Sequence, residues 1–256
     1  MSELLPRTPS FRLEGRRALV TGAGRGIGCA AAAALGEAGA EVTLLARGRD
    51  EISAAAKEIV ARGGRADAVS LDILDLGAVA DFFATRPPFD ILVNNAGMNR
   101  PGPMTDLTLS DYDAVFDLNV KAAYFVAQAC VRQLTTVGRP GSLIHMGSQM
   151  GHVGGVNRSL YCGTKWAIEG MSKAFALDLA PYRIRSNTIA PTFIETPMTR
   201  PFFEDAAFKA GVLEKIKLGR LGRVEDVMGA VVFLASDAAA LVTGTSLIVD
   251  GGWTAD

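Results

Sequence analysis

Short runs of apolar and β-branched residues alternate along the chain with longer segments whose apolar residues recur at helical spacing. Strands buried on both faces of a parallel sheet have nearly continuous apolar runs, and such alternation indicates strands joined by helical crossovers. The predicted strands are Arg17–Thr21, Glu41–Ala46, Ala66–Leu71, Asp90–Asn94, Ser142–Met146, Arg185–Ile189 and Ser246–Val249. The predicted helices are Gly26–Ala38, Glu51–Arg62, Leu76–Thr85, Ser110–Leu134, Tyr161–Leu179 and Val224–Ala235. This order predicts the α/β class, with a doubly wound, seven-stranded parallel sheet covered by helices on both faces.

No linker-like tract and no internal repeat divides the 256 residues, so we expect one domain over residues 1–256. Residues 1–13 are predicted to form a loose N-terminal arm. The segment from Ala190 to about Leu221 interrupts the alternation with prolines and phenylalanines. Because it follows the C-terminal end of a strand, we expect a substrate lid over about residues 190–221. The alternative is a surface excursion that only packs on the core.

Charge and composition narrow the function classes. The 26 Lys+Arg balance 27 Asp+Glu, and the lack of a basic stripe argues against nucleic acid or an anionic membrane as partners. No uncharged apolar run approaches the roughly 20 residues that span a bilayer, and the first residues lack a secretory apolar stretch. We therefore expect a cytoplasmic protein. Cys29, Cys130 and Cys162 form no CxxC pair, and no side chains show metal-ligand spacing, so reduced thiols and no metal are expected.

Glycines cluster where the first predicted strand meets the first predicted helix, in Thr21-Gly22-Ala-Gly-Arg25-Gly26-Ile27-Gly28. Glycines let the backbone turn sharply and let a pyrophosphate approach the N–H groups of the helix N-terminus. A tight turn without a ligand is the alternative. A lone glycine cluster is weak evidence, so its interpretation depends on features further along the chain.

Tyr161 and Lys165 are four residues apart in a predicted helix, which places both side chains on one face. A free tyrosine, with a pKa of about 10, is too weak a base near neutrality. Lowering that pKa by roughly three units needs about 4 kcal/mol of preference for the phenolate. A cation about 4 Å away at an effective dielectric of 20 supplies about that much. We therefore predict that Lys165 lowers the pKa of Tyr161 and makes it a proton donor and acceptor.

Over nearly its entire length the chain resembles the short-chain dehydrogenase/reductase family. The glycine turn matches the family's Thr-Gly-x-x-x-Gly-x-Gly, and the later landmarks follow in order, namely Asn94-Asn95-Ala96-Gly97, Asn119, Ser148 and Tyr161-x-x-x-Lys165. The resemblance is to bacterial 3-oxoacyl-(acyl carrier protein) reductase-like and gluconate/polyol dehydrogenase-like members. It implies a single-domain Rossmann fold. It also implies reversible hydride transfer between a nicotinamide cofactor and a ketone or secondary alcohol.

The resemblance implies four catalytic residues. Tyr161 is the general acid in reduction and the base in oxidation, and Lys165 also holds the cofactor ribose. Ser148 orients the substrate and steadies the developing charge at the reacting oxygen. Asn119 bends its helix and holds a water in a proton relay that leads to Lys165.

The expected cofactor contacts come partly from the residues and partly from the resemblance. Ala46-Arg47 stands where NAD binders carry an acid, and a guanidinium can bind a 2′-phosphate with two charge-assisted bonds. NADP(H) is therefore favoured, with Arg25 of the glycine turn as a second cation for the 2′-phosphate. NAD(H) is the alternative, since either arginine can instead be a solvated surface charge. By resemblance, Asp72 contacts the adenine, and Ile194 and Thr196 contact the nicotinamide. The expected cofactor-binding residues are Gly22, Arg25, Gly26, Ile27, Gly28, Arg47, Asp72, Asn95, Ala96, Gly97, Tyr161, Lys165, Pro191, Ile194 and Thr196. Thr192 departs from the glycine that many relatives have at this position.

The substrate is less strongly encoded. Gln149, His152, Asn157 and Arg158 predict a polar mouth for a hydroxylated or anionic substrate, whereas the phenylalanines of the lid favour an apolar portion. A 3-oxoacyl thioester and a sugar acid or polyol are the leading classes. The alternatives are an NAD-dependent alcohol dehydrogenase of the same family and a non-catalytic dinucleotide-sensing binding protein. The second is disfavoured because the catalytic residues are all present.

Two further expectations concern packing. His145 lies in a buried strand and is expected to be a core histidine whose hydrogen bonds are satisfied. The helices Ser110–Leu134 and Tyr161–Leu179 carry apolar residues around much of their circumference. In relatives such helices pair between subunits, and the C-terminal strand makes a second interface. The resemblance therefore implies a homotetramer, with a dimer as the alternative.

Overall fold

The seven predicted strands form one parallel sheet in the order β3-β2-β1-β4-β5-β6-β7. The computed structural model describes residues 5–255. The strands are β1 Arg17–Thr21, β2 Glu41–Ala46, β3 Arg65–Ser70, β4 Ile91–Asn94, β5 Gly141–Met146, β6 Ile184–Pro191 and β7 Ser246–Val249. The order reverses direction at β1, between β2 and β4, and ligands of such sheets bind at the carboxyl ends of the strands near that point. The predicted single-domain Rossmann fold is confirmed.

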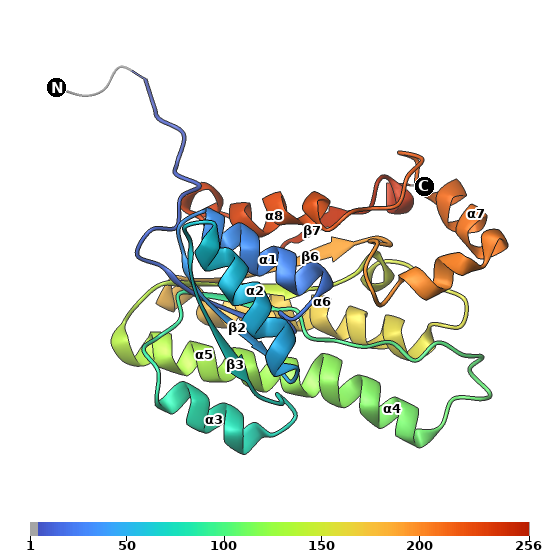
Figure 1. Cartoon of the computed structure of the whole chain (residues 1–256), viewed down its shortest axis with the longest axis horizontal. Helices are drawn as coiled ribbons and strands as arrows, with labels where there is room; N and C mark the ends of the chain where they lie inside the picture. The colour runs from blue at the N-terminus through green and yellow to red at the C-terminus, as the bar shows by residue number, and fades with distance from the viewer. Residues whose placement is uncertain (1–4, 256) are drawn as a thin grey trace.

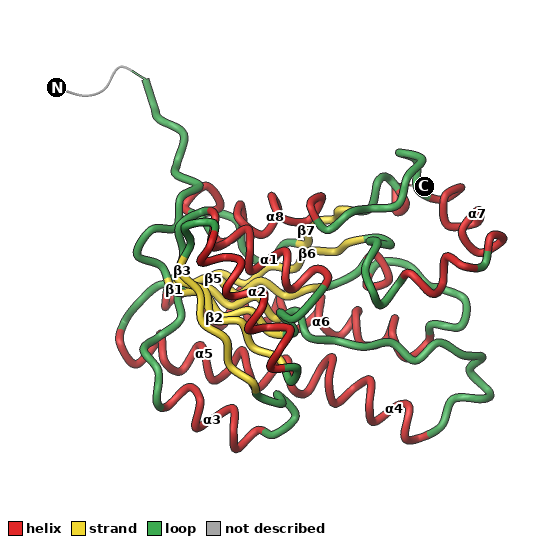
Figure 2. The backbone as a smooth tube through the Cα atoms, in the orientation of Figure 1, coloured by secondary structure: helices red, strands yellow, loops and turns green. Residues whose placement is uncertain are grey.

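Helices cover both faces of this sheet, as Figures 1 and 2 show. The α-helices are α1 Gly26–Glu37, α2 Arg49–Ala61, α3 Leu76–Ala84, α4 Leu109–Phe116, α5 Ala123–Val137, α6 Ser159–Leu179, α7 Ala206–Lys215 and α8 Glu225–Ala235. The 3-10 turns are η2 Gln149–Gly151, η3 Ala180–Tyr182, η4 Arg200–Glu204, η5 Asp237–Ala239 and η6 Trp253–Ala255, and η1 Asp117–Ala122 is π-helical.

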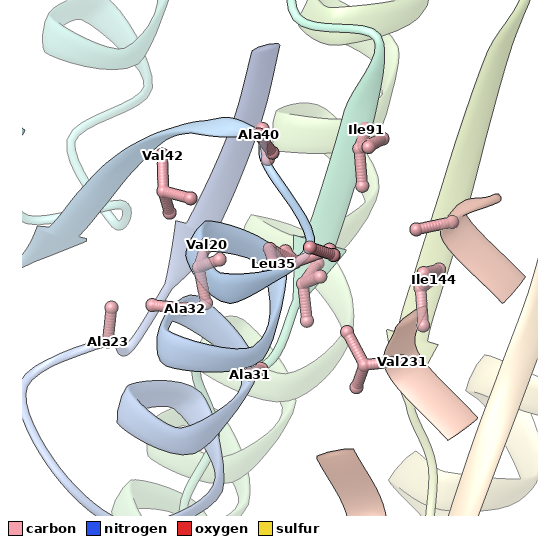
Figure 3. Close-up of a cluster of buried hydrophobic side chains, with 14 of the residues drawn as sticks. Val20, Ala23, Ala31, Ala32, Leu35, Ala40, Val42, Ile91, Ile144 and Val231 are labelled. Carbon is pink, nitrogen blue, oxygen red and sulfur yellow. The ribbon is translucent and has the colours of Figure 1, made fainter. Parts of the chain in front are cut away.

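Alternate residues of the central strands enter two separate cores. In β1, Val20 packs with α1 and α8 on one face, while Leu19 packs with α3 and α5 on the other. Figure 3 shows the first core, where small residues of α1 such as Ala31 and Ala32 let that helix lie close to the sheet. Burial on both faces explains why the strands have apolar runs instead of an alternating pattern.

The predicted helix Ser110–Leu134 is a continuous helix with a change of winding in the middle. Its α4 and α5 parts are joined by the π-helical segment η1, which contains Asn119. Among the described residues, the helix Leu109–Val137 is the one whose length and composition would suffice to cross a membrane, and 39% of its most apolar window is buried within the protein. Such π-helical insertions are frequent at functional sites.

Two predicted segments differ from their expected form. In the arm, residues 1–4 lie outside the described residues and Leu5–Arg12 are exposed, but Leu13 is buried and its N–H donates to the carbonyl of Ala38. The segment 190–221 contains an unpredicted helix, α7, whose first turn is capped by the Asp205 carboxylate. The helix was not predicted because the prolines and aromatic residues around Asp205 resemble a loop. The segment forms an apolar cluster of its own, with Val212, Ile216 and Leu221 buried at its centre.

Candidate active site

The glycine turn is held against the end of the neighbouring strand. Thr21 Oγ1 accepts hydrogen bonds from the backbone N–H groups of Asn95 and Ala96 at 3.0 and 3.1 Å. The Asn95 side-chain amide donates back to the carbonyls of Thr21 and Gly22 at 3.0 and 3.2 Å. Gly22 has φ of +64°, and a Cβ at Gly28 would lie 2.3 Å from the Gly22 carbonyl oxygen. These positions therefore require glycine for conformation and for close approach respectively.

The N-terminus of α1 lacks the side-chain caps that begin α3, α4 and α7. No side chain caps it and no acidic residue lies in its first turn, whereas Asp75, Thr108 and Asp205 cap α3, α4 and α7. Uncapped N–H groups at a helix N-terminus can bind a phosphate. Thr196 lies against the same turn, since a Cβ at Gly26 would be 3.3 Å from its Cγ2. The turn therefore fits a dinucleotide pyrophosphate, with Thr196 beside it.

Two arginines border this turn near the end of β2. Arg47 lies 3.9 Å from the Asp72 carboxylate and Arg25 lies 3.8 Å from the Glu51 carboxylate, while their side chains remain 76% and 66% exposed. Exposed ion pairs at such distances are weak, so both guanidiniums can turn to another anion. Asp72 also accepts a hydrogen bond from the Leu74 N–H at 3.0 Å. The arrangement fits a 2′-phosphate at the end of β2.

The three central catalytic candidates come together beside the carboxyl end of β5. Ser148 follows that strand, and its hydroxyl accepts from the Met150 N–H at 3.1 Å and donates to Gln149 Oε1 at 3.2 Å. Lys165 lies one turn after Tyr161 on α6, with its Nζ 5.4 Å from the centre of the Tyr161 ring. The same Nζ donates to the Met146 carbonyl at 2.7 Å. That hydrogen bond ties α6 to the end of β5 and fixes the lysine beside the tyrosine.

The pKa of Tyr161 is raised, whereas the prediction made from Lys165 alone was that it is lowered. Burial raises the pKa of Tyr161, while a hydrogen bond with Ser148 and the charge of Arg158 act against that rise. Burial also lowers the pKa of Lys165 to about 8, and the nearby Glu169 charge opposes that change. Desolvation disfavours the charged form of both groups, and spacing along a helix contains no information about it. The expectation of a net lowered phenol pKa was therefore wrong for the protein's own groups.

Asn119 is buried within the π-helical segment η1 and connects three parts of the site. Its Oδ1 accepts from the Met98 N–H at 2.8 Å, and its Nδ2 donates to the Met98 carbonyl at 2.9 Å and to Thr164 Oγ1 at 3.1 Å. Thr164 is the residue before Lys165. Asn119 thus links the loop after β4 to helix α6.

A cavity in front of Ser148 and Tyr161 contains two of the four predicted substrate residues, Gln149 and Arg158. His152 is turned away, because its Nε2 lies 3.0 Å from Ser246 Oγ and 3.5 Å from the Glu169 carboxylate. Asn157 is exposed in a left-handed turn with φ of +57° and does not line the cavity. The expected polar mouth is corrected accordingly. The predicted lid contributes Thr192, Phe193, Met198, Thr199 and Phe202 to the lining, and the lining residues that sequence reasoning missed are Asn99 and Met150.

Glu169 is a buried carboxylate that sequence reasoning also missed. It lies one turn beyond Lys165 on α6 and accepts from Thr188 Oγ1 at 2.8 Å and Ser246 Oγ at 3.3 Å. A Cβ at Gly147 would lie 2.7 Å from Glu169 Oε1, so the carboxylate packs directly beneath the loop that carries Ser148. A side chain in place of Gly147 would therefore collide with the Glu169 carboxylate.

His145 is buried as predicted, but it is not satisfied, because neither ring nitrogen has a hydrogen-bond partner. Burial lowers the pKa of His145 to about 4, which keeps the ring neutral. The three cysteines are unpaired. Within residues 5–255, no group of three His, Cys, Asp or Glu side chains could hold a metal ion.

Comparison with known proteins agrees with this geometry. A family model described as enoyl-(acyl carrier protein) reductase matches residues 22–254, which span the glycine turn and the catalytic helix. The chain belongs to the short-chain dehydrogenase/reductase family. It is 38% identical over 245 residues to D-erythrulose reductase of Gallus gallus, covering 96% of this chain and 98% of that protein.

Solved structures of this family superpose over nearly the whole chain. A candidate 2-deoxy-D-gluconate 3-dehydrogenase from Agrobacterium tumefaciens with bound NADP is 42% identical, with a TM-score of 0.93 and coverage of 98% of this chain and 100% of that one. A gluconate 5-dehydrogenase from Burkholderia cenocepacia in complex with NADP and tartrate is 36% identical, with a TM-score of 0.91 and coverage of 96% and 98%. The protein is therefore an NAD(P)-dependent dehydrogenase/reductase that acts on alcohol and ketone groups.

Proposed function

We propose that this short-chain dehydrogenase/reductase uses NADP(H) to interconvert a small polar ketone and its secondary alcohol, with a sugar acid or polyol as the substrate class. The observation that carries the proposal is one cavity that contains Ser148, Tyr161 and the polar side chains of Gln149 and Arg158. A 3-oxoacyl thioester, the other expected class, is less well matched by these polar groups. The alternative of an NAD-dependent alcohol dehydrogenase is decided by the cofactor experiment below.

The protein's own residues position the reacting oxygen and manage its proton. When bound, the cofactor supplies or accepts the hydride. Tyr161 donates its hydroxyl proton to the carbonyl oxygen in reduction and takes it back in oxidation, and Ser148 donates a hydrogen bond to the same oxygen. Lys165 stabilises the phenolate and holds the ribose, and Asn119 supports Lys165 through Thr164. The segment 190–221 closes over the substrate as a lid.

In the proposed cofactor site, each part of the NADP(H) molecule is assigned to the residues whose chemistry suits it. The pyrophosphate lies at the uncapped N-terminus of α1, among Gly22, Gly26, Ile27 and Gly28. Arg47 and Arg25 bind the 2′-phosphate, and Asp72 lies near the adenine. The segment Asn95–Gly97 lines the pocket, and Pro191, Ile194 and Thr196 hold the nicotinamide. In support, Ile194 is buried and forms a bridge to Gly222, so its backbone is fixed.

A panel of ketones, sugar acids, polyols and 3-oxoacyl thioesters, followed by NADPH and NADH absorbance in both directions, tests this proposal. Turnover of at least one polar ketone or alcohol with NADP(H) is expected. Arg47→Ala should raise the Michaelis constant for NADPH at least about tenfold more than that for NADH, since only NADPH has the 2′-phosphate that a guanidinium binds. Equal effects on the two cofactors would refute the assignment of Arg47. Cofactor binding without any turnover would favour a dinucleotide-sensing protein.

We further propose a cytoplasmic homotetramer. Large apolar side chains are exposed on the helices expected to pair between subunits, including Trp166 at 54% and Leu177 at 80% on α6. Tyr124 and Phe125 of α5 are also exposed. The edge strand β7 exposes Ile248 and is positioned for a second interface.

Sedimentation at micromolar concentration tests the assembly. A tetramer is expected for the natural chain and smaller species for Trp166→Glu, because a buried unpaired charge opposes association. Lys57→Glu, a charge reversal at an exposed position of α2, outside the helices and the strand proposed to pair, is the control. A monomeric natural chain would refute the proposal.

A further inference from the structure

We infer that Arg158, Asn99 and Thr192 form a subsite that binds the carboxylate and a hydroxyl group of the substrate, so that the enzyme selects polyhydroxy acids over neutral polyols and acyl thioesters. The inference rests on the proposed function, because it names the substrate class of the same cavity. It assigns a specific recognition role to each of the three residues, which come from three separate segments of the chain.

Arg158 is a half-buried cation whose charge is not paired by any carboxylate of the described residues. It lines the cavity and lies three residues before Tyr161, at the start of α6. Its guanidinium lies 5.2 Å from the centre of the Phe202 ring, and its Nη1 donates to the Asn157 carbonyl at 3.2 Å. The ring contact and the hydrogen bond fix the fork while leaving other N–H donors for a ligand.

A partly desolvated charge without a counter-ion is unfavourable, and the planar fork of arginine matches a carboxylate through two parallel hydrogen bonds. Burial lowers the pKa of Arg158, and the adjacent Tyr161 opposes that change. A guanidinium remains cationic at neutral pH. An anionic substrate would supply the missing partner, and a neutral alditol would leave the charge unpaired.

Two residues that line the same cavity have buried oxygen atoms without hydrogen-bond partners. They are Asn99 Oδ1, in the loop after β4, and Thr192 Oγ1, directly after β6. Among the described residues, buried side-chain polar atoms without a partner otherwise occur only at Gln133 and His145. A buried polar group without a hydrogen-bond partner destabilises the folded protein. Asn99 and Thr192 lie on two separate loops that line one cavity, so we assign the missing hydrogen-bond partners of their buried oxygens to a ligand bound there.

The chemistry of the two oxygens points to hydroxyl groups. The amide oxygen of Asn99 accepts a hydrogen bond, and the Thr192 hydroxyl can donate and accept. Substrate hydroxyls can satisfy both atoms, whereas the alkyl chain of an acyl thioester would leave both unpaired. Together with the unpaired cation, these oxygens favour a ligand that carries a carboxylate and neighbouring hydroxyl groups close to the carbon that reacts at Tyr161 and Ser148.

Matched substrate pairs test this subsite. Each pair differs only in a carboxylate replaced by a hydroxymethyl group, as in D-gluconate with D-glucitol and D-galactonate with galactitol, and a 3-hydroxybutyryl thioester is added. With NADP⁺, the natural enzyme should prefer the acid of a pair by about 100-fold in kcat/KM, the scale expected for a site built around charge-assisted bonds. Arg158→Met should reduce that preference about 100-fold, and Arg158→Lys should restore part of it. Thr192→Val, which removes only the hydroxyl, should lower kcat/KM about tenfold for both members of a pair.

The control is Arg100→Met, which removes a neighbouring arginine that is outside the cavity and near Asp111, and which should leave the acid preference unchanged. Equal losses of kcat/KM for acid and alditol in Arg158→Met would overturn the inference. A natural enzyme that turns over alditols or the thioester as fast as the acids would also overturn it. The proposed function would stand in both cases. Thermal unfolding with NADP⁺ gives a second readout. Acids should stabilise the natural protein and not Arg158→Met. If no substrate of the panel turns over, the proposed function fails, and this thermal shift still decides the inference.

Discussion

The same substitution, glycine to alanine, is expected to have opposite effects at two helical positions of this protein. At Gly28, in the first turn of α1, an added Cβ would lie 2.3 Å from the Gly22 carbonyl oxygen and 2.4 Å from Asn95 Nδ2. Gly229, in the middle of α8, is exposed and has no heavy atom within 4 Å of its added Cβ. The two changes are identical in chemistry and differ only in the surrounding structure.

The cost at Gly28 has two parts. Overpacking of a well-packed site costs about 1–3 kcal/mol. Displacing the Asn95 amide also weakens its hydrogen bonds to the carbonyls of Thr21 and Gly22, at about 0.5–1.5 kcal/mol each. Alanine's higher helix propensity returns up to about 1 kcal/mol. The net is a loss of roughly 3 kcal/mol at Gly28, against a gain of about 0.5–1 kcal/mol at Gly229.

Thermal unfolding at one fixed protein concentration measures both variants. For a chain of this size, the loss at Gly28 corresponds to a Tm about 6–12 °C lower for Gly28→Ala, and the gain at Gly229 to a Tm about 1–4 °C higher for Gly229→Ala. NADPH should raise the Tm of the natural protein and of Gly229→Ala, and have little effect on Gly28→Ala. A Gly28→Ala variant that unfolds within 1 °C of the natural protein would refute the packing argument.

Three further substitutions test the proton-transfer group and the segment over the cavity. Lys165→Met removes a charge 5.4 Å from the Tyr161 ring centre, and Coulomb's law at an effective dielectric of 20 gives about 3 kcal/mol, or roughly 2 pKa units. Because oxidation needs the phenolate, the midpoint of the pH profile for oxidation should shift about 2 units toward higher pH in Lys165→Met. The control Lys173→Met should leave the pH profile unchanged. An unchanged profile in Lys165→Met would contradict the role of the charge. Glu169→Gln removes the charge that opposes the lowered pKa of Lys165, so Lys165 should lose its proton below about pH 8. The pH profile for oxidation should then move to higher pH, but by less than in Lys165→Met. A shift to lower pH would count against this assignment. Phe193→Ala deletes the ring that contacts Phe203, Phe208 and Trp253, so the KM for substrate should rise at least about tenfold while NADPH affinity is retained; an unchanged KM would show that the segment is only a surface excursion.

The fold and much of the site could be predicted because their signals are local. Strands and helices follow from apolar periodicity within a dozen residues. The six predicted helices cover seven of the eight α-helices, since one of them spans both α4 and α5, and all seven strands were located apart from small differences in their ends. Helix α7 was missed since its cap, Asp205, lies among prolines and phenylalanines that resemble a loop. The glycine turn and the pair Tyr161 and Lys165 are likewise defined by spacing along the chain.

Other properties depend on which distant residues come together. Burial reverses the expected direction of the Tyr161 pKa, because desolvation is set by the whole fold. Glu169 acquires its environment from Thr188 and Ser246, which are 19 and 77 residues away in the sequence. His152 was expected at the cavity and instead lies beside them.

The sequence by itself determined the class of fold, the glycine turn and the helical pair that we propose transfers the proton, because each is encoded by neighbours along the chain. Only the tertiary structure decided which polar atoms are left without partners. Asn99, Arg158 and Thr192 come from three separate segments, and their shared cavity exists only after the strands are aligned in the sheet. Whether a buried polar atom has a hydrogen-bond partner depends on residues that the fold brings together, and for that reason the roles inferred for Asn99 and Thr192 rest on the folded protein.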